Sequence, residues 1–418
     1  MFHISRSIII LVRKKALRIG AALLVCIGLL WGVSYYVKST QSSFKPSGGE
    51  YVILANNDTG MHCIQPDYSA FLILPPGNNL GVQVFEKGKD KAELITSGIT
   101  LEYEVNDNTS SADKVNFWEY AKDYGYDIAP NVGITGNKLK GVLKLSSDKK
   151  YFEVTAIPVV PYNDGQKQVN PYQTVKITVK DSSSGKVLAV QDKVVLPVSD
   201  EMMCSNCHGT QDTDKNILMA HDGSNGTKLY TDLTQGKRHR CNECHSDNVL
   251  NAPGKDGLPA LSQAIHGFHS SRMGMSKLAN QCYNCHPGEV TKCNRGVMAA
   301  NGITCADSKC HGSMENVSQT ILNGRRPWLD EPDCGACHGA DYAVNIGMLY
   351  RSSYLVNGPD DMNGEIKCIS CHNSAHSEWP STLPLDNVIP VQLYGRPDFI
   401  RKCSACHEGT GKLHGAGR

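Results

Sequence analysis

The feature that most constrains this chain is a five-residue pattern, Cys-x-x-Cys-His, which recurs along its second half. Six copies keep this spacing, and a seventh, CADSKCH, has four residues between its cysteines. The cysteines of the seven motifs are Cys204 and Cys207, Cys241 and Cys244, Cys282 and Cys285, Cys305 and Cys310, Cys334 and Cys337, Cys368 and Cys371, and Cys403 and Cys406. The histidines that close them are His208, His245, His286, His311, His338, His372 and His407.

This pattern is the attachment signature of c-type haem. Two cysteines three residues apart lie on one face of a helical turn, where their sulfurs can form thioethers with the two vinyl groups of one porphyrin edge. The histidine that follows can supply the proximal nitrogen to iron. In the stretched motif the two extra residues must loop outward, because the vinyl separation is unchanged. Zinc ribbons, thioredoxin-like pairs and disulfide frameworks do not require a histidine after every second cysteine. The seven motifs therefore predict seven covalently bound haem c groups.

Each iron also needs a second axial ligand. Seven histidines of the predicted exported part lie outside the motifs: His62, His221, His239, His266, His269, His376 and His414. This matched count predicts bis-histidine ligation, which gives low-potential electron carriers, with at most one or two methionine ligands. Short spacings predict that His376 serves a haem other than that of His372, that His239 serves a haem other than that of the motif it precedes, and that His266 and His269 serve adjacent haems.

The motif-rich half holds only six of these seven histidines. We therefore expect His62 to ligate an iron and to tie the first half of the chain to the haem region. The alternative is a surface-loop histidine, with one haem ligated by methionine or left open. His311 is the only histidine in the sequence between His286 and His338. The third to fifth haems are therefore expected to draw their second ligands mostly from the His221–His269 region.

Residues 51–200 and 201–418 differ in composition. The first segment contains short stretches that alternate apolar and polar residues, with a hairpin signal at 182–185, and it predicts an antiparallel, immunoglobulin-like β-sandwich without haem. The second segment is rich in Gly, Asn and Ser and has too few residues for each motif to build an aliphatic core. It predicts a seven-haem cytochrome c domain of short helices and irregular backbone around the porphyrins.

Residues 1–50 read as a cytoplasmic tail, a membrane anchor at 19–37 and a polar linker. Arginines and lysines precede an uninterrupted apolar run, Ile19 to Val37. At about 1.5 Å per residue this run spans roughly 28 Å, close to the hydrocarbon thickness of a bilayer. The preceding positive charge predicts that everything after the run is exported. We expect a single-pass protein of the cytoplasmic membrane with its bulk in the periplasm; secretion after signal cleavage is the alternative.

Charge and the remaining cysteines add two constraints. With 42 basic and 41 acidic residues the net charge is +1, which gives no case for nucleic-acid binding. Of 17 cysteines, Cys26, Cys63 and Cys293 lie outside the motifs. We expect Cys63 and Cys293 to form a disulfide, since both would lie in an oxidising compartment; free, buried thiols are the alternative.

Over residues 204–418 the chain resembles the multihaem c-type cytochromes of metal- and mineral-respiring bacteria. Two further stretches, NDTGMHC (57–63) and LPVSDEMMCSNCH (196–208), resemble segments of larger multihaem cytochromes that carry an N-terminal β domain. The resemblance implies electron transfer between a quinol-side donor and a terminal acceptor, with other redox proteins as partners. The stretched motif departs from the family pattern and leaves the order and spacing of the fourth haem open.

The expected function is electron transfer rather than catalysis, so no catalytic residue is predicted. One alternative is a reductase of nitrite, hydroxylamine or a sulfur oxyanion, which needs an open iron; nitrite reductases of this class carry a Cys-x-x-Cys-Lys motif, and this sequence has none. Another is a subunit of an extracellular cytochrome filament, which requires cleavage after the apolar run. Binding of CO to the reduced protein separates the carrier from the reductase.

Overall fold

The described part of the chain is mixed in fold, with β sheets and a few short helices. The computed structural model describes residues 49–88, 92–276, 278–330, 332, 334, 365–400 and 405–406. The expected tail and membrane anchor lie outside these residues. Among the residues that are described, no helix is both long enough and apolar enough to cross a membrane.

The first sheet is built on β1 (Tyr51–Asn57) and β4 (Leu80–Glu86), which pair antiparallel from Tyr51 opposite Glu86 to Asn57 opposite Leu80. Its strand order is β1-β4-β9-β8, with β9 at Phe152–Val154, β8 at Lys144–Leu145, and β5 (Glu93–Leu94) also paired with β4. All of β1 after Tyr51 is buried. A strand covered on both faces has no polar side, which explains the near-continuous apolar sequence YVILA.

The second sheet has the order β2-β11-β10-β6-β7. Its strands are β2 (His62–Cys63), β11 (Val187–Ser199), β10 (Tyr172–Asp181), β6 (Ile99–Val105) and β7 (Lys140–Val142). Along β10 buried and half-buried residues alternate, as expected for a strand with one face on a core. The predicted hairpin at 182–185 joins β10 to β11, and the carboxylate of Asp181 accepts the amides of Ser183 and Ser184 in its turn.

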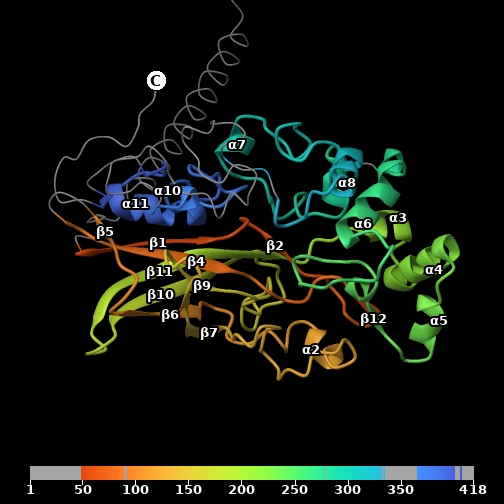
Figure 1. The fold of residues 1–418 in the computed structure, drawn as a ribbon, viewed down its shortest axis with the longest axis horizontal. Coiled ribbons are helices and arrows are strands. Elements are labelled where there is room, and N and C mark those ends of the chain that lie inside the picture. The colour runs from red at the N-terminus through yellow and green to blue at the C-terminus, as the bar shows by residue number, and fades with distance from the viewer. Residues whose placement is uncertain are drawn as a thin grey trace, which may run out of the picture. The chain divides into compact units, whose positions relative to one another are not determined.

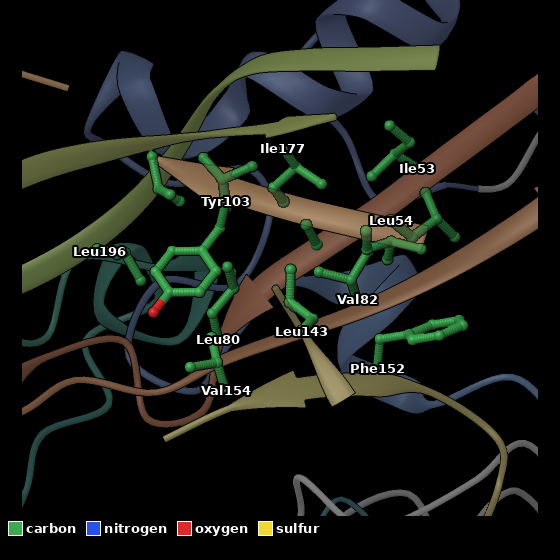
Figure 2. Close-up of a cluster of buried hydrophobic side chains, with 14 of the residues drawn as sticks. Ile53, Leu54, Leu80, Val82, Tyr103, Leu143, Phe152, Val154, Ile177 and Leu196 are labelled. Carbon is green, nitrogen blue, oxygen red and sulfur yellow. The ribbon is translucent and has the colours of Figure 1, made fainter. Parts of the chain in front are cut away.

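Both sheets contribute to one hydrophobic core. Figure 2 shows Leu54 and Val82 of the first sheet near Tyr103 and Ile177 of the second, with their side chains directed into a common interior. The same core includes Ile366, Trp379 and Ile389, which lie far along the chain. Helix α10 (Cys368–His372) lies beside β1, and α11 (Val388–Tyr394) lies beside β11 (Figure 1). Side chains from both sides of the domain boundary predicted near residue 200 therefore pack in one core.

The described part of the motif region, residues 201–418, contains short helices with little aliphatic packing. They are α3 (Ser205–His208), α4 (Thr213–Asn225), α5 (Leu229–Thr234), α6 (Leu261–Ser270), α7 (Val297–Ala300) and α8 (Met314–Leu322), with 3₁₀ turns at Cys241–Glu243, Met273–Met275, Gln281–Asn284 and Pro384–Asn387; α2 (Phe117–Tyr120) precedes them. Helices α6 and α8 pack together, yet every residue of α6 keeps some exposure. Parallel pairing of β12 (His239–Arg240) with β3 (Phe71–Leu72) attaches this region to the first half of the chain.

The Glu201 carboxylate accepts hydrogen bonds from residues 288–291 and so holds the start of the motif region in place. One oxygen accepts the amides of Glu289 and Val290 at 2.9 and 3.0 Å, and the other accepts the amide and hydroxyl of Thr291 at 2.9 and 2.7 Å. The amide of Gly288 adds a longer contact of 3.3 Å. Burial alone would raise the pKa of Glu201, but these hydrogen bonds outweigh it and lower the pKa below its usual range. The segment before the first motif is thereby held to the loop after the third.

Replacing Glu201 with glutamine is expected to lower the free energy of unfolding by about 2 kcal/mol at pH 7, since hydrogen bonds to an ionised acceptor are lost. A lowered folded-state pKa stabilises the protein above the unfolded-state pKa of about 4.3, and this contribution disappears as the pH falls through the folded value. The difference between the two proteins should therefore shrink at pH 4 and below, measured by urea unfolding. Exposed Glu289, replaced in the same way, is the control; an unchanged difference at low pH would contradict the account.

Candidate metal centres

Each regular motif in the described residues folds as a single helical turn. The amide of the motif histidine donates to the carbonyl of the first cysteine: His208 to Cys204 at 2.9 Å, His245 to Cys241 at 3.1 Å, and His286 to Cys282 at 2.9 Å. In the sixth motif the whole CISCH sequence forms α10. The turn brings both sulfurs and the imidazole of a motif onto one short segment.

The stretched motif closes in the same way. The amide of His311 donates to the carbonyl of Cys305 at 3.3 Å, so the contact between the ends of the motif is kept across the two extra residues. Inside it, the amide of Cys310 donates to the carbonyl of Asp307 at 2.9 Å. Ala306, Ser308 and Lys309 are exposed. The insertion therefore forms a surface turn, as expected if its ends must match those of the regular motifs.

Four motif histidines each face a histidine from outside the motifs. The ring centroids are 6.3 Å apart for His208 and His269, 6.4 Å for His245 and His221, 6.0 Å for His286 and His266, and 6.3 Å for His311 and His376. In each pair one histidine closes a motif and the other is a spare histidine, meaning a histidine outside the motifs. The rings of His266 and His269 face different motifs, as their spacing predicts. The fourth motif does not follow the prediction of a ligand from the His221–His269 region, because His376 lies opposite it.

The separation suits two ligands of one metal. A metal–imidazole bond of about 2 Å on each side places the ring centroids roughly 6 Å apart. Aromatic rings in direct contact span a wider range of about 4.5 to 7 Å, so the distance alone does not identify a metal site. The four values differ by only 0.4 Å although their interplanar angles run from 21° to 79°. The separation is shared but the ring orientation is not. This favours a metal ion bound between the two rings over direct stacking of one ring on the other.

Hydrogen bonds orient the rings in these pairs. The Nδ1 atoms of His245, His266, His269 and His376 lie 2.7–2.9 Å from backbone carbonyls, and that of His221 lies 2.9 Å from the hydroxyl of Thr227. A neutral imidazole that donates from Nδ1 has its lone pair on Nε2, the nitrogen that would bind a metal. Burial lowers the pKa of His286 to about 4, with His266, His311 and His376 nearby, and burial also lowers those of His208 and His221. These shifts favour the neutral, ligating form.

The motifs themselves lie close together. The side-chain amide of Asn206 in the first motif donates to the side-chain oxygen of Asn284 in the third at 3.1 Å. Cys305 of the fourth motif lies near Cys282 of the third and raises the pKa of the Cys282 thiol. Burial raises the pKa of Cys371 to about 12, with a further contribution from nearby Cys406 of the seventh motif.

Two predicted ligands have other partners. The ring of His239 bridges two carboxylates, with Nε2 at 2.7 Å from Asp232 and Nδ1 at 3.0 Å from Glu243. In His62 the Nε2 atom lies 2.6 Å from Asp58, and the ring meets Trp328 edge-on at 5.8 Å. In the described part of the chain neither ring is paired with a motif histidine. Their ligand roles stay predictions, without support from these contacts.

The remaining predicted positions are placed only in part. The ring of His372 stacks on Phe399 at 5.2 Å. Cys337, His338, Cys403, His407 and His414 lie outside the described residues. The carbonyl acceptors that orient the rings, such as those of Thr59, Pro259 and Ile265, were not found from the sequence. Every residue has a carbonyl, so residue type carries no signal for this role.

Among the residues that the structure describes, no group of three or more His, Cys, Asp or Glu side chains could hold a metal ion by itself. Comparisons of the chain with protein-family models, with curated proteins and with solved structures found no match.

Cys63 and Cys293 are free thiols in the structure. Burial raises the pKa of Cys63, with a further contribution from nearby Cys293, and burial raises the pKa of Cys293 to about 12. Both should resist alkylation in the native protein at pH 8, since the thiolate is the reactive form. After unfolding without reductant both should react, as mass spectrometry of the modified peptides would show. Protection of both after unfolding would instead establish the disulfide that the sequence allows.

Proposed function

We propose that this protein is an electron carrier that holds seven covalent c-type haems. The observation that carries the proposal is the set of four histidine pairs, each with one motif histidine, one spare histidine and a centroid separation of 6.0–6.4 Å. The local backbone fits the same group, because each motif turn in the described residues presents two cysteines next to the histidine. The pairs His208–His269, His245–His221, His286–His266 and His311–His376 would hold the first four haems.

The chain's residues would tune these haems toward low potential. Haem supplies reversible one-electron oxidation and reduction, and two imidazole ligands give a lower potential than histidine with methionine. A carbonyl acceptor on Nδ1 increases the basicity of the ring and fixes its orientation. Contacts between the first, third and fourth motifs keep their attachment sites adjacent, as transfer between centres requires.

The proposal also covers the arrangement of the β sheets, the location of the protein and its partners. The two five-stranded sheets share a core and are antiparallel except for the short parallel pair of β2 with β11. They support a sandwich, for which we propose an immunoglobulin-like arrangement. The basic residues and apolar run of 1–37 support a single-pass anchor in the cytoplasmic membrane with the bulk in the periplasm. Suitable partners are a quinol-side donor and a periplasmic or extracellular redox protein as acceptor.

A second candidate function rests on His239. Its ring nitrogens lie against Asp232 and Glu243, so the bond to iron would require breaking at least one of these contacts. If His239 stays with its carboxylates, at most six histidines from outside the motifs serve seven irons. One iron would then have methionine or an open position, and an open position is what a reductase needs.

The mature protein is expected to contain seven covalent haems. Intact mass and the pyridine haemochrome assay should agree on this number. Cys305→Ala with Cys310→Ala should lower it to six, because the stretched motif keeps the end-to-end contact of the regular ones. Six haems in the unmodified chain and in this variant would show that the stretched motif attaches none.

Substitutions of His221 and of His239 can be compared to test which histidines bind iron. His221→Ala should convert one six-coordinate low-spin haem to a form that binds CO when reduced, because the ring opposite His245 is lost. His239→Ala should leave the electron paramagnetic resonance spectrum and the CO binding of the parent protein unchanged. If His239→Ala creates a new CO-binding haem, His239 is a ligand and the case for an open iron is lost. Rapid CO binding by the unmodified protein would favour the reductase.

A further inference from the structure

His376 is held in an uncommon backbone conformation. Its φ angle is +68°, in the left-handed region that non-glycine residues seldom adopt. Its carbonyl accepts the amides of Arg295 and Gly296 at 2.7 and 2.8 Å, and its own amide donates to Glu378 at 3.1 Å. Such a conformation persists where the surroundings over-determine it. The backbone of His376 is therefore fixed from a segment that lies between the third and fourth motifs.

The ring of His376 is oriented by the first half of the chain. Nδ1 lies 2.9 Å from the carbonyl of Thr59. Thr59 belongs to a turn in which the side-chain oxygen of Asn57 accepts the amides of Thr59 and Gly60 at 3.0 and 2.6 Å. The hydroxyl of Ser374 donates to the carbonyl of Asn57 and closes the contact from the other side. The stretch NDTG, whose composition predicts a turn, thus presents a carbonyl to the ring.

Gly60 is needed for this close approach. Its φ angle is +78°, and a Cβ atom built on it would overlap the carbonyl oxygen of Ala375. Any side chain here would push the Asn57–Gly60 turn away from the segment that carries His376. The contact between Thr59 and His376 depends on that approach.

Arg295 joins the three segments around His376. Its guanidinium donates to both carboxylate oxygens of Asp386 at 2.7 and 3.0 Å, and to the carbonyl of Gly60 at 2.8 Å. Both charged side chains are buried. One side chain thus holds the turn that orients the ring, while the backbone of the same residue holds the carbonyl of His376.

We propose that Arg295 and the Asn57–Gly60 turn are positioning elements that set His376 as the ligand opposite His311. This inference rests on the proposed function and adds that the first half of the chain tunes the fourth haem through a carbonyl, without supplying a ligand to it. Loss of the carbonyl contact would make the ring less basic and would raise the potential of that haem alone.

The test uses the full-length, haem-loaded protein. Gly60→Ala and Arg295→Lys are each expected to shift the g values of one low-spin signal and to raise the midpoint potential of one haem, leaving the others unchanged. Lysine cannot donate to Asp386 in bidentate geometry while also reaching Gly60. Gly125→Ala is the matched control, because Gly125 has the same φ angle of +78° and no atom within 4 Å of a built Cβ.

His376→Met identifies the signal to follow, because it should replace one bis-histidine signal with a histidine–methionine one. If His376→Met changes no haem, the ligand assignment of the proposed function fails. A second outcome is that His376→Met changes one haem, while Arg295→Lys and Gly60→Ala affect that haem no more than Gly125→Ala does. In that case His376 is a ligand, and the positioning role is overturned. Should Gly60→Ala not accumulate with all its haems, Arg295→Lys gives the decisive reading.

Discussion

The structure of the motif region depends on holding pairs of imidazoles a fixed distance apart. The partners come from distant parts of the chain: α6 supplies the rings opposite His208 and His286, while His376 lies opposite His311. The described part of this region has few buried aliphatic side chains, and no residue of α6 is fully buried. In the proposed haem-loaded protein, each pair would be a cross-link between segments that otherwise pack weakly. Such cross-links and the porphyrins would supply the stability that an aliphatic core gives elsewhere.

The β sheets then serve as a rigid base for part of this region. The core under β1 and β11 extends to Ile366, Trp379 and Ile389, so α10 and α11 are fixed by ordinary apolar packing. At the other end, Glu201 and the β12–β3 pair attach the first three motifs to the same base through hydrogen bonds. Apolar packing dominates where side chains can fill the interior. Directional polar contacts dominate where the backbone is irregular.

Much of this arrangement could be read from the sequence, for identifiable reasons. The motif turns follow from local spacing, and the β10–β11 hairpin follows from alternation and turn residues, which are short-range signals. The β segment was predicted as an immunoglobulin-like sandwich, of which the structure shows the β sheets, and packing of residues 366–389 on them was missed. Pairing of distant histidines is set by tertiary structure, so spacing could exclude the pair His372–His376 but could not choose His311. The bridging of His239 by Asp232 and Glu243 was also missed, because Asp232 is seven residues away in α5, on the other side of a turn.

The buried ion pair of Arg295 and Asp386 is better understood through geometry than through stability. Two charges removed from water lose hydration that their attraction barely repays, and apolar replacements are often as stable. Asp386 also accepts the hydroxyl of Ser381 at 2.6 Å, and its backbone carbonyl accepts the indole of Trp379 at 2.6 Å. These contacts have fixed directions, which apolar packing does not provide. A ring that must present one nitrogen to a metal within a narrow range of orientations needs such directions. The ion pair lies where three segments meet around His376, whose ring would need one orientation to bind the proposed fourth haem.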